Sequence, residues 1–196
     1  MFGIVGIPMR WTSVVHGRVP GMDDRRWDLA ALQHLAATLD GSTKGPYEAP
    51  ATDRIEPREI VDGVWAADLD GARYSASDFA VVSLCRTGTP FSHATQRCAY
   101  LTDDDENPDL DRVLNDVLDD MEALRADGRE VLVHCHGGAS RTGFILRGWL
   151  IRTKGLSVEG ATERVAGRWP HLGLWNVSFT EALHRLAERN RRGEGE

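Results

Sequence analysis

Short apolar runs and longer helical stripes alternate along the chain after residue 58. The short runs are bounded by Asp, Gly, Ser or Thr, and they predict strands at residues 60–66, 79–84 and 98–101. Apolar positions from Leu110 to Leu124 recur every three or four residues, which predicts an amphipathic helix ending near residue 127. The run Val131–Val133 is too short for a helix and predicts a strand buried on both faces.

Helical patterns continue after residue 140. They predict helices at about residues 141–153, 157–168 and 176–190, with Ser157 and Asn176 as N-caps of the last two. Strands that alternate with helices imply a largely parallel sheet. The expected fold class is therefore α/β, a single domain with a central, mostly parallel sheet flanked by helices.

The first 55 residues have a different pattern. Residues 24–39 carry an apolar stripe at helical spacing, and residues 41–57 are rich in Gly and Pro, which disfavours packed structure there. We therefore expect an N-terminal extension with one helix and a linker at 1–55, the folded domain at 56–190, and a charged tail at 191–196.

Charge and cysteine content narrow the classes of function. The chain has 23 basic and 30 acidic residues and a net charge of −7, which would repel nucleic acid and anionic lipid headgroups. Its apolar runs fall short of the roughly 20 residues that cross a bilayer. Three cysteines are too few and odd in number for a disulfide framework. We expect a soluble, cytoplasmic protein with free thiols and no nucleic-acid or membrane partner, while its oligomeric state stays open.

The segment VLVHCHGGASRTG, residues 131–143, carries the chemistry. A buried strand ends at a cysteine, a loop with two glycines follows, and an arginine opens a helix. Successive backbone N–H groups in such a loop, together with the helix N-terminus, form a nest for a tetrahedral oxyanion, and glycine permits the backbone angles it needs. The predicted phosphate-binding residues are His136, Gly137, Gly138, Ala139, Ser140 and Arg141.

Cys135 would lie at the centre of this positive field, which favours its thiolate form. The thiolate could attack phosphorus and form a phosphocysteine intermediate that water then hydrolyses. Arg141 can hold two phosphate oxygens and stabilise the charge that develops on them. Thr142 can direct its hydroxyl at the sulfur, and Ser140 is expected to brace the loop. No metal or cofactor is required.

These residues resemble a known family. The pattern H-C-x-x-G-x-S-R-T-G, at His134–Gly143, is similar to the signature loop of protein tyrosine and dual-specificity phosphatases. The resemblance extends over about residues 58–186 and includes IVDGVWAADLD, FAVVSLC, Arg168-Trp169-Pro170 and Asn176–Phe179. It implies a dual-specificity phosphatase-like fold that hydrolyses phosphotyrosine, with phosphoserine and phosphothreonine as further candidates, on phosphorylated protein substrates. The N-terminal 55 residues show no such resemblance.

The resemblance also implies a general acid, an aspartate on a loop before the cysteine. That loop reads LTDDDENPDL here. Asp103 extends the alternation of the preceding strand, whereas the interval to Leu110 selects Asp104, and both stay candidates. Asp105 satisfies these two constraints less well.

The two histidines beside Cys135 have separate expected roles. By resemblance, His134 is buried, hydrogen-bonds the loop and helps to hold the thiolate. His136 occupies a variable position at the pocket entrance, where it either tunes substrate choice or is only solvated. A metal site made of Cys135 and these histidines is disfavoured, because adjacent residues at a strand end point in opposite directions.

Three residues elsewhere carry two interpretations each. Cys85 resembles a position that some relatives use as a resolving cysteine, although a core residue of small size is an equal explanation. Trp169 and Trp175 could form a pocket wall, but aromatic packing against the sheet is favoured.

Two alternatives to an active phosphatase remain. One is a catalytically silent phosphoprotein-binding module that uses the same anion loop, although binding alone needs no nucleophile. The other is a sulfurtransferase or arsenate reductase with a similar loop, where the aspartate loop and the Arg-Trp-Pro element are not expected.

Overall fold

A computed structural model of the chain describes residues 54–104 and 106–193. The predicted helix at 24–39 and most of the predicted linker at 41–57 lie outside these residues. The division of the chain at 55 and 190 stays a prediction.

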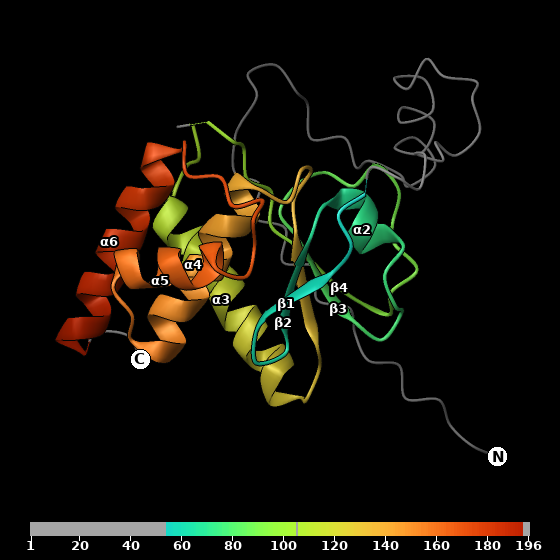
Figure 1. Cartoon of the computed structure of the whole chain (residues 1–196), viewed down its shortest axis with the longest axis horizontal. Coiled ribbons are helices and arrows are strands. Elements are labelled where there is room, and N and C mark those ends of the chain that lie inside the picture. The colour runs from blue at the N-terminus through green and yellow to red at the C-terminus, as the bar shows by residue number, and fades with distance from the viewer. Residues whose placement is uncertain (1–53, 105, 194–196) are drawn as a thin grey trace, which may run out of the picture. The chain divides into compact units, whose positions relative to one another are not determined.

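A five-stranded mixed sheet forms the centre of the described fold (Figure 1). Its strands, in the spatial order β1-β2-β5-β3-β4, are β1 Arg58–Val61, β2 Val64–Ala67, β5 Val131–His134, β3 Ala80–Ser83 and β4 Thr95–Cys98. Only the β1–β2 pairing is antiparallel, and the other three pairings are parallel. The expected α/β class with a mostly parallel sheet is confirmed.

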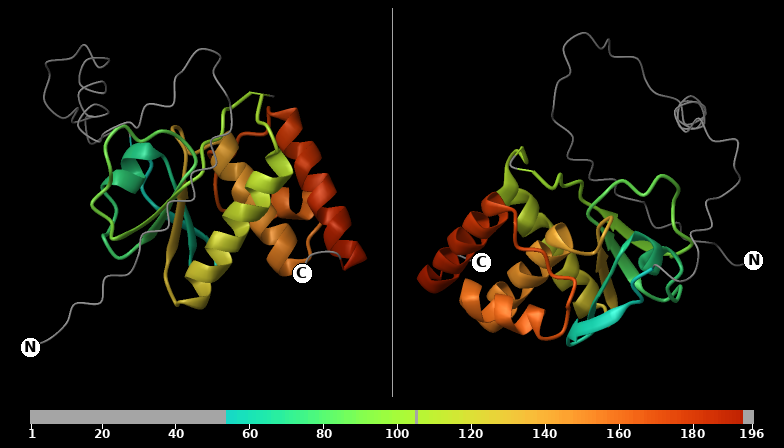
Figure 2. Two further views of the ribbon diagram at one scale, coloured as in Figure 1. Left: turned by 180° about the vertical axis from the view of Figure 1, so that it is seen from behind. Right: turned by 45° about the horizontal axis from the view of Figure 1, so that its top comes forward.

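Helices cover both faces of this sheet, unequally. They are α2 Leu69–Arg73, α3 Leu110–Ala126, α4 Ser140–Lys154, α5 Val158–Ala166 and α6 Val177–Arg192. The four long helices α3 to α6 lie on one face and the short α2 lies on the other, as views from opposite sides both show (Figures 1 and 2). None of these described helices is long and apolar enough to cross a membrane.

The central strand β5 explains why the core has two parts. Successive side chains of a strand point to opposite faces. Val131 and Val133 therefore belong to the large core beneath α3 to α6, and Leu132 belongs to the smaller core beneath α2. All four residues of β5 are buried, as the continuous apolar run predicted.

The predicted helices agree with α3 to α6 to within a few residues, and both predicted N-caps are confirmed. The Ser157 hydroxyl accepts from the Gly160 N–H at 3.1 Å, and the Asn176 side chain accepts from the Phe179 N–H at 3.1 Å. Each cap supplies a partner for a helix-end N–H that has none within its helix.

Two strand predictions were wrong in their bounds, and α2 was missed. Residues 60–66 are not one strand, because Asp62 and Gly63 adopt φ of 39° and 75° and turn the chain into the β1–β2 hairpin. The strand expected at 98–101 is β4, Thr95–Cys98, a largely polar edge strand that apolar periodicity does not reveal. Helix α2 has only five residues, with Asp68 as its N-cap.

Candidate active site

Cys135 directly follows β5 at the end of the sheet where the parallel strands have their carboxyl ends. The loop between β5 and α4 spans residues 135–139, and the Cys135 side chain is only 2% exposed. Gly143 N–H donates to the Ala139 carbonyl at 2.8 Å and closes the first turn of α4. The strand, loop and helix therefore follow one another at the residues where the sequence predicted them.

Two contacts from distant segments hold the loop in shape. The Leu69 N–H, at the start of α2, donates to the His136 carbonyl at 3.1 Å. The Trp169 indole N–H donates to the Gly138 carbonyl at 2.7 Å. Because both carbonyls are engaged from outside, the loop does not need its own N–H groups to satisfy them.

Gly138 is the position where the loop requires glycine. Its φ is +65°, and a Cβ there would come within 2.8 Å of the Ala67 carbonyl oxygen. Gly137 has no such restriction, since a Cβ at that position would meet nothing within 4 Å. The sequence predicted the same role for both glycines, but only Gly138 has a φ and a close contact that exclude other residues.

The start of α4 gathers buried polar atoms that lack partners among the described residues. These atoms are Ser140 Oγ, Arg141 Nε and Thr142 Oγ1. Arg141 also donates from Nη1 to the Leu101 carbonyl at 3.2 Å, which fixes its side chain across the loop. Buried polar groups are nearly always hydrogen-bonded, so ordered water or a polar ligand would have to supply the partners of these three atoms.

His134 is fully buried behind the loop. Its Nε2 lies 2.7 Å from the Ser83 hydroxyl, and the Phe91 ring stacks on the imidazole with centroids 5.2 Å apart. Burial, the largest cause, lowers the pKa of His134 to about 4, so the ring is neutral near pH 7. Its Nδ1 lies 3.3 Å from the Cys135 carbonyl oxygen, in line with the predicted contact to the loop. His136 is exposed.

The aspartate loop begins at Leu101, whose carbonyl accepts the hydrogen bond from Arg141. Both Asp103 and Asp104 are exposed. The Asp104 carboxylate accepts from the Thr102 hydroxyl at 2.6 Å and from the Glu106 N–H at 3.0 Å, and these bonds lower its pKa. The structure gives no description of Asp105.

The cysteines are free thiols in different environments. Cys85, just beyond β3, is buried, and burial raises its pKa to about 11. Strand β3 pairs with β5 in parallel register at Ser83 and His134, so Cys85 and Cys135 emerge from neighbouring strands at the same edge. Cys98 is exposed.

Trp169 and Trp175 also differ in their environments. Trp169 is 1% exposed within the large core, as the packing interpretation expected. Trp175 is 63% exposed, so the expectation that it packs against the sheet was wrong. The indole N–H of Trp169 was missed as a support of the loop, because its acceptor lies 31 residues away in sequence.

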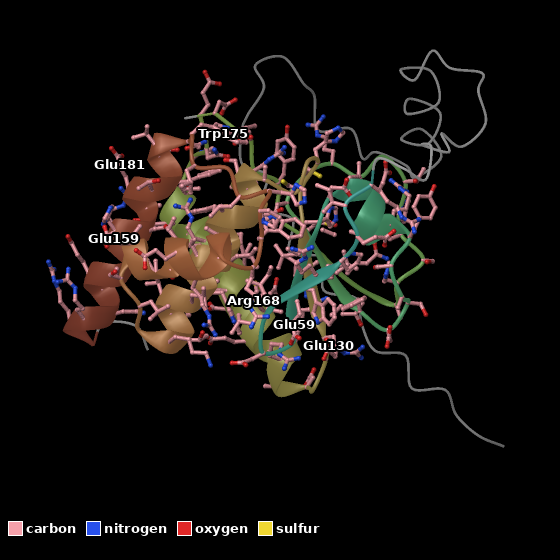
Figure 3. All side chains as sticks on the ribbon, viewed as in Figure 1. Glu59, Glu130, Glu159, Arg168, Trp175 and Glu181 are labelled. Atoms are coloured by element: carbon pink, nitrogen blue, oxygen red, sulfur yellow. The ribbon has the colours of Figure 1, made fainter. Side chains whose placement is uncertain are left out.

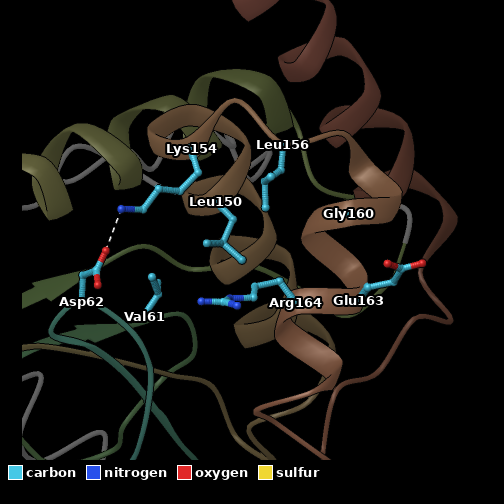
Figure 4. A pocket seen from close by; sticks show the side chains of 8 residues that line it. All are labelled: Val61, Asp62, Leu150, Lys154, Leu156, Gly160, Glu163 and Arg164. Atoms are coloured by element: carbon cyan, nitrogen blue, oxygen red, sulfur yellow. Dashed lines mark hydrogen bonds and ion pairs between the residues drawn. The ribbon is translucent and has the colours of Figure 1, made fainter.

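A separate pocket of about 570 Å³ lies between the β1–β2 turn and helices α4 and α5 (Figure 4). Val61, Leu150 and Leu156 give it an apolar wall, and the Lys154 ammonium pairs with the Asp62 carboxylate at 2.6 Å. Asp62 precedes β2, whereas Cys135 follows the parallel β5. The pocket is therefore at the opposite end of the strands from Cys135.

A β5–loop–α4 unit with a buried cysteine, set in this mixed sheet, belongs to the class of cysteine-based phosphatase folds. The chain is a member of the dual specificity phosphatase catalytic-domain family, whose model matches residues 76–189. The family and fold expected from the signature loop are thereby confirmed.

Individual relatives support this assignment. Human dual specificity protein phosphatase 12 is 38% identical over 88 residues, which cover 39% of this chain and 26% of that protein. The matched stretch thus spans about a quarter of the length of this relative.

Solved structures agree in fold. Human DUSP28 superposes with a TM-score of 0.61 at 19% identity and covers 76% of this chain and 99% of its own. A human tyrosine phosphatase-like serine/threonine/tyrosine-interacting protein gives 0.59 at 18% identity, covering 70% and 99%. Because the second protein is named phosphatase-like, the shared fold does not by itself establish phosphatase activity.

Proposed function

We propose that this chain hydrolyses phosphate monoesters on protein side chains through a phosphocysteine intermediate. The observation that carries the proposal is the cluster of buried polar atoms of Ser140, Arg141 and Thr142, without partners among the described residues, at the start of the helix that follows the loop of the buried Cys135. The oxygens of a phosphate group would supply acceptors for the arginine, and the phosphorus would then lie in reach of the sulfur.

In the first step, the Cys135 thiolate attacks phosphorus as the bond to the side-chain oxygen breaks. The amino-terminal end of α4, the loop N–H groups and the Arg141 guanidinium surround the reacting sulfur with partial or full positive charge. The same groups stabilise negative charge on the phosphoryl oxygens in the transition state. These residues provide the charge stabilisation, so the step calls for no metal or cofactor.

The departing oxygen takes a proton, and we assign Asp103 as its donor. Asp104 is held as a carboxylate by the Thr102 hydroxyl and the Glu106 N–H, and its lowered pKa opposes a role as an acid. Asp103 forms no such bonds within the described residues. It follows Leu101, whose carbonyl binds Arg141, by only two residues.

In the second step, water attacks phosphorus and the sulfur–phosphorus bond breaks, while the deprotonated Asp103 accepts a proton from that water. The sulfur leaves as a thiolate, and the Thr142 hydroxyl, buried without a partner among the described residues, can donate to it. Inorganic phosphate and the regenerated Cys135 thiolate are the products. Phosphorylated proteins of the cytoplasm are the proposed substrates, in keeping with three free thiols.

Release of inorganic phosphate from phosphotyrosine and phosphoserine/threonine peptides, with EDTA present, tests the proposal. Wild type should turn over and Cys135→Ser should not. Asp103→Asn should lower kcat by on the order of 10²–10⁴ with phenol-type leaving groups, and Asp104→Asn should have a much smaller effect. If wild type binds these peptides but releases no phosphate, the silent binding module replaces the phosphatase.

A further inference from the structure

Three exposed apolar side chains lie within four residues of one another at the start of α6. Leu174, Trp175 and Val177 are 50%, 63% and 63% exposed, and we call them the apolar rim. Trp175, labelled in Figure 3, lies at the edge of the domain beside the amino-terminal end of α6. Apolar groups that gather on a surface indicate interaction sites, whereas single exposed ones do not.

The indole of Trp175 packs against the backbone of Gly173. A Cβ at Gly173 would come within 2.2 Å of the ring, so glycine is what allows this close approach. The rest of the indole faces solvent as a large apolar surface with one hydrogen-bond donor. Tryptophan is among the residue types that contribute most to binding at interfaces.

The apolar rim adjoins both parts of the proposed active site. Leu172, just before the rim, packs so closely on Gly143 that a Cβ there would lie 2.2 Å from its Cδ1. Gly143 is two residues after Arg141 on α4. Asn176 lies between two residues of the apolar rim in the sequence, and its side-chain amide donates to the Asp104 carbonyl at 3.1 Å. The rim is therefore continuous with the helix that carries the arginine and with the aspartate loop.

Resting on the function proposed above, we propose that the apolar rim binds an apolar side chain of the phosphoprotein substrate, a few residues from the phosphorylated one. A polypeptide that inserts its phosphate at Cys135 must cross the adjoining surface. The phosphate makes the same contacts in every substrate, so discrimination has to come from neighbouring side chains. The rim offers such a neighbour apolar burial beside the aspartate loop.

A panel of phosphotyrosine peptides tests this inference, each with one leucine moved stepwise along flanks of Ser and Gly. We expect one position at which leucine lowers KM on the order of tenfold, the value of burying one such side chain. Trp175→Ala should remove this preference by raising KM, without changing kcat or the turnover of phenyl phosphate. Leu174→Ser should weaken the preference in the same way.

Tyr74→Ala is the matched control, because Tyr74 is an aromatic residue 51% exposed at the end of α2, on the other face of the sheet. It should keep the full preference. The inference is overturned if wild type shows no leucine preference, if Trp175→Ala retains it, or if that variant slows phenyl phosphate equally. Failure of wild type to release phosphate from both the peptides and phenyl phosphate would instead contradict the proposed function, and peptide binding to Cys135→Ser would then test the rim.

Discussion

Asn176 joins two features that a substitution can separate. Its side-chain oxygen caps α6 by accepting from the Phe179 N–H at 3.1 Å and from the Ser178 hydroxyl at 2.7 Å. Its amide nitrogen donates to the Asp104 carbonyl, also at 3.1 Å. The side chain is 5% exposed, so solvent cannot readily replace these bonds. The cap should act on stability, and the bond to Asp104 should act on the proposed acid step.

The typical strengths of these two kinds of hydrogen bond give a magnitude for each effect in Asn176→Ala. Loss of an N-cap costs about 1 kcal/mol, and loss of the bond to Asp104 costs about another 1 kcal/mol. The free energy of unfolding should therefore fall by about 2 kcal/mol. If the bond to Asp104 contributes its roughly 1 kcal/mol to holding the aspartate loop in its proposed catalytic position, kcat should fall about fivefold when the bond is lost.

Asn176→Asp separates the two contributions, because a carboxylate caps a helix but cannot donate to the Asp104 carbonyl. It should keep most of the stability and still lose about fivefold in kcat. Ser157→Ala removes the N-cap of α5 and serves as the matched control. That variant should lose about 1 kcal/mol of stability and retain its kcat.

Urea unfolding and turnover of two aryl phosphates measure these effects. Phenol is a poor leaving group and needs protonation, whereas 4-nitrophenol leaves readily without it. Asn176→Ala and Asn176→Asp should therefore slow phenyl phosphate more than 4-nitrophenyl phosphate. Equal slowing of both esters, or a kcat in Asn176→Asp equal to wild type, would refute the link between this amide and the acid step.

Three further predictions concern the loop and its surroundings. Burial holds the pKa of His134 near 4, against 6.5 for an exposed histidine, so the unfolded chain binds this proton at a higher pH than the folded chain does. The free energy of unfolding, measured by urea titration at each pH, should therefore fall by on the order of 3 kcal/mol as the pH drops from 6.5 to 4. The fall should be smaller in His134→Asn. Gly138→Ala should lower the free energy of unfolding in urea by roughly 1–3 kcal/mol and impair phosphate release, because of the positive φ at Gly138. Gly137→Ala should leave the unfolding midpoint nearly unchanged. Equal midpoints for the two variants would contradict the role assigned to φ at Gly138. The resolving role implied for Cys85 predicts that hydrogen peroxide converts Cys135 to a sulfenic acid, which condenses with the Cys85 thiol to a disulfide and water. Mass spectrometry without reductant should find the linked peptides in wild type. If these peptides are absent, Cys85 is only a core residue.

Local signals in the sequence determined much of this protein. The apolar run of β5, the glycines and Arg141 predicted a strand, loop and helix in that order, because each depends on residues only a few positions apart. The stripe of α3 and the N-caps Ser157 and Asn176 are local in the same sense. The family also followed from one contiguous segment, His134–Gly143, and the match over residues 76–189 confirms it.

Only the tertiary structure decided features that depend on distant contacts. The polar edge strand β4 is a strand because it pairs with β3, which no apolar alternation reveals. The support of Gly138 by Trp169 joins residues 31 apart, and the bond from Asn176 to Asp104 joins residues 72 apart. Asp103 and Asp104 are adjacent and chemically identical, so spacing left both open. Hydrogen bonds to Asp104 distinguish their environments, since a side chain's surroundings are set by the folded chain and not by its place in the sequence.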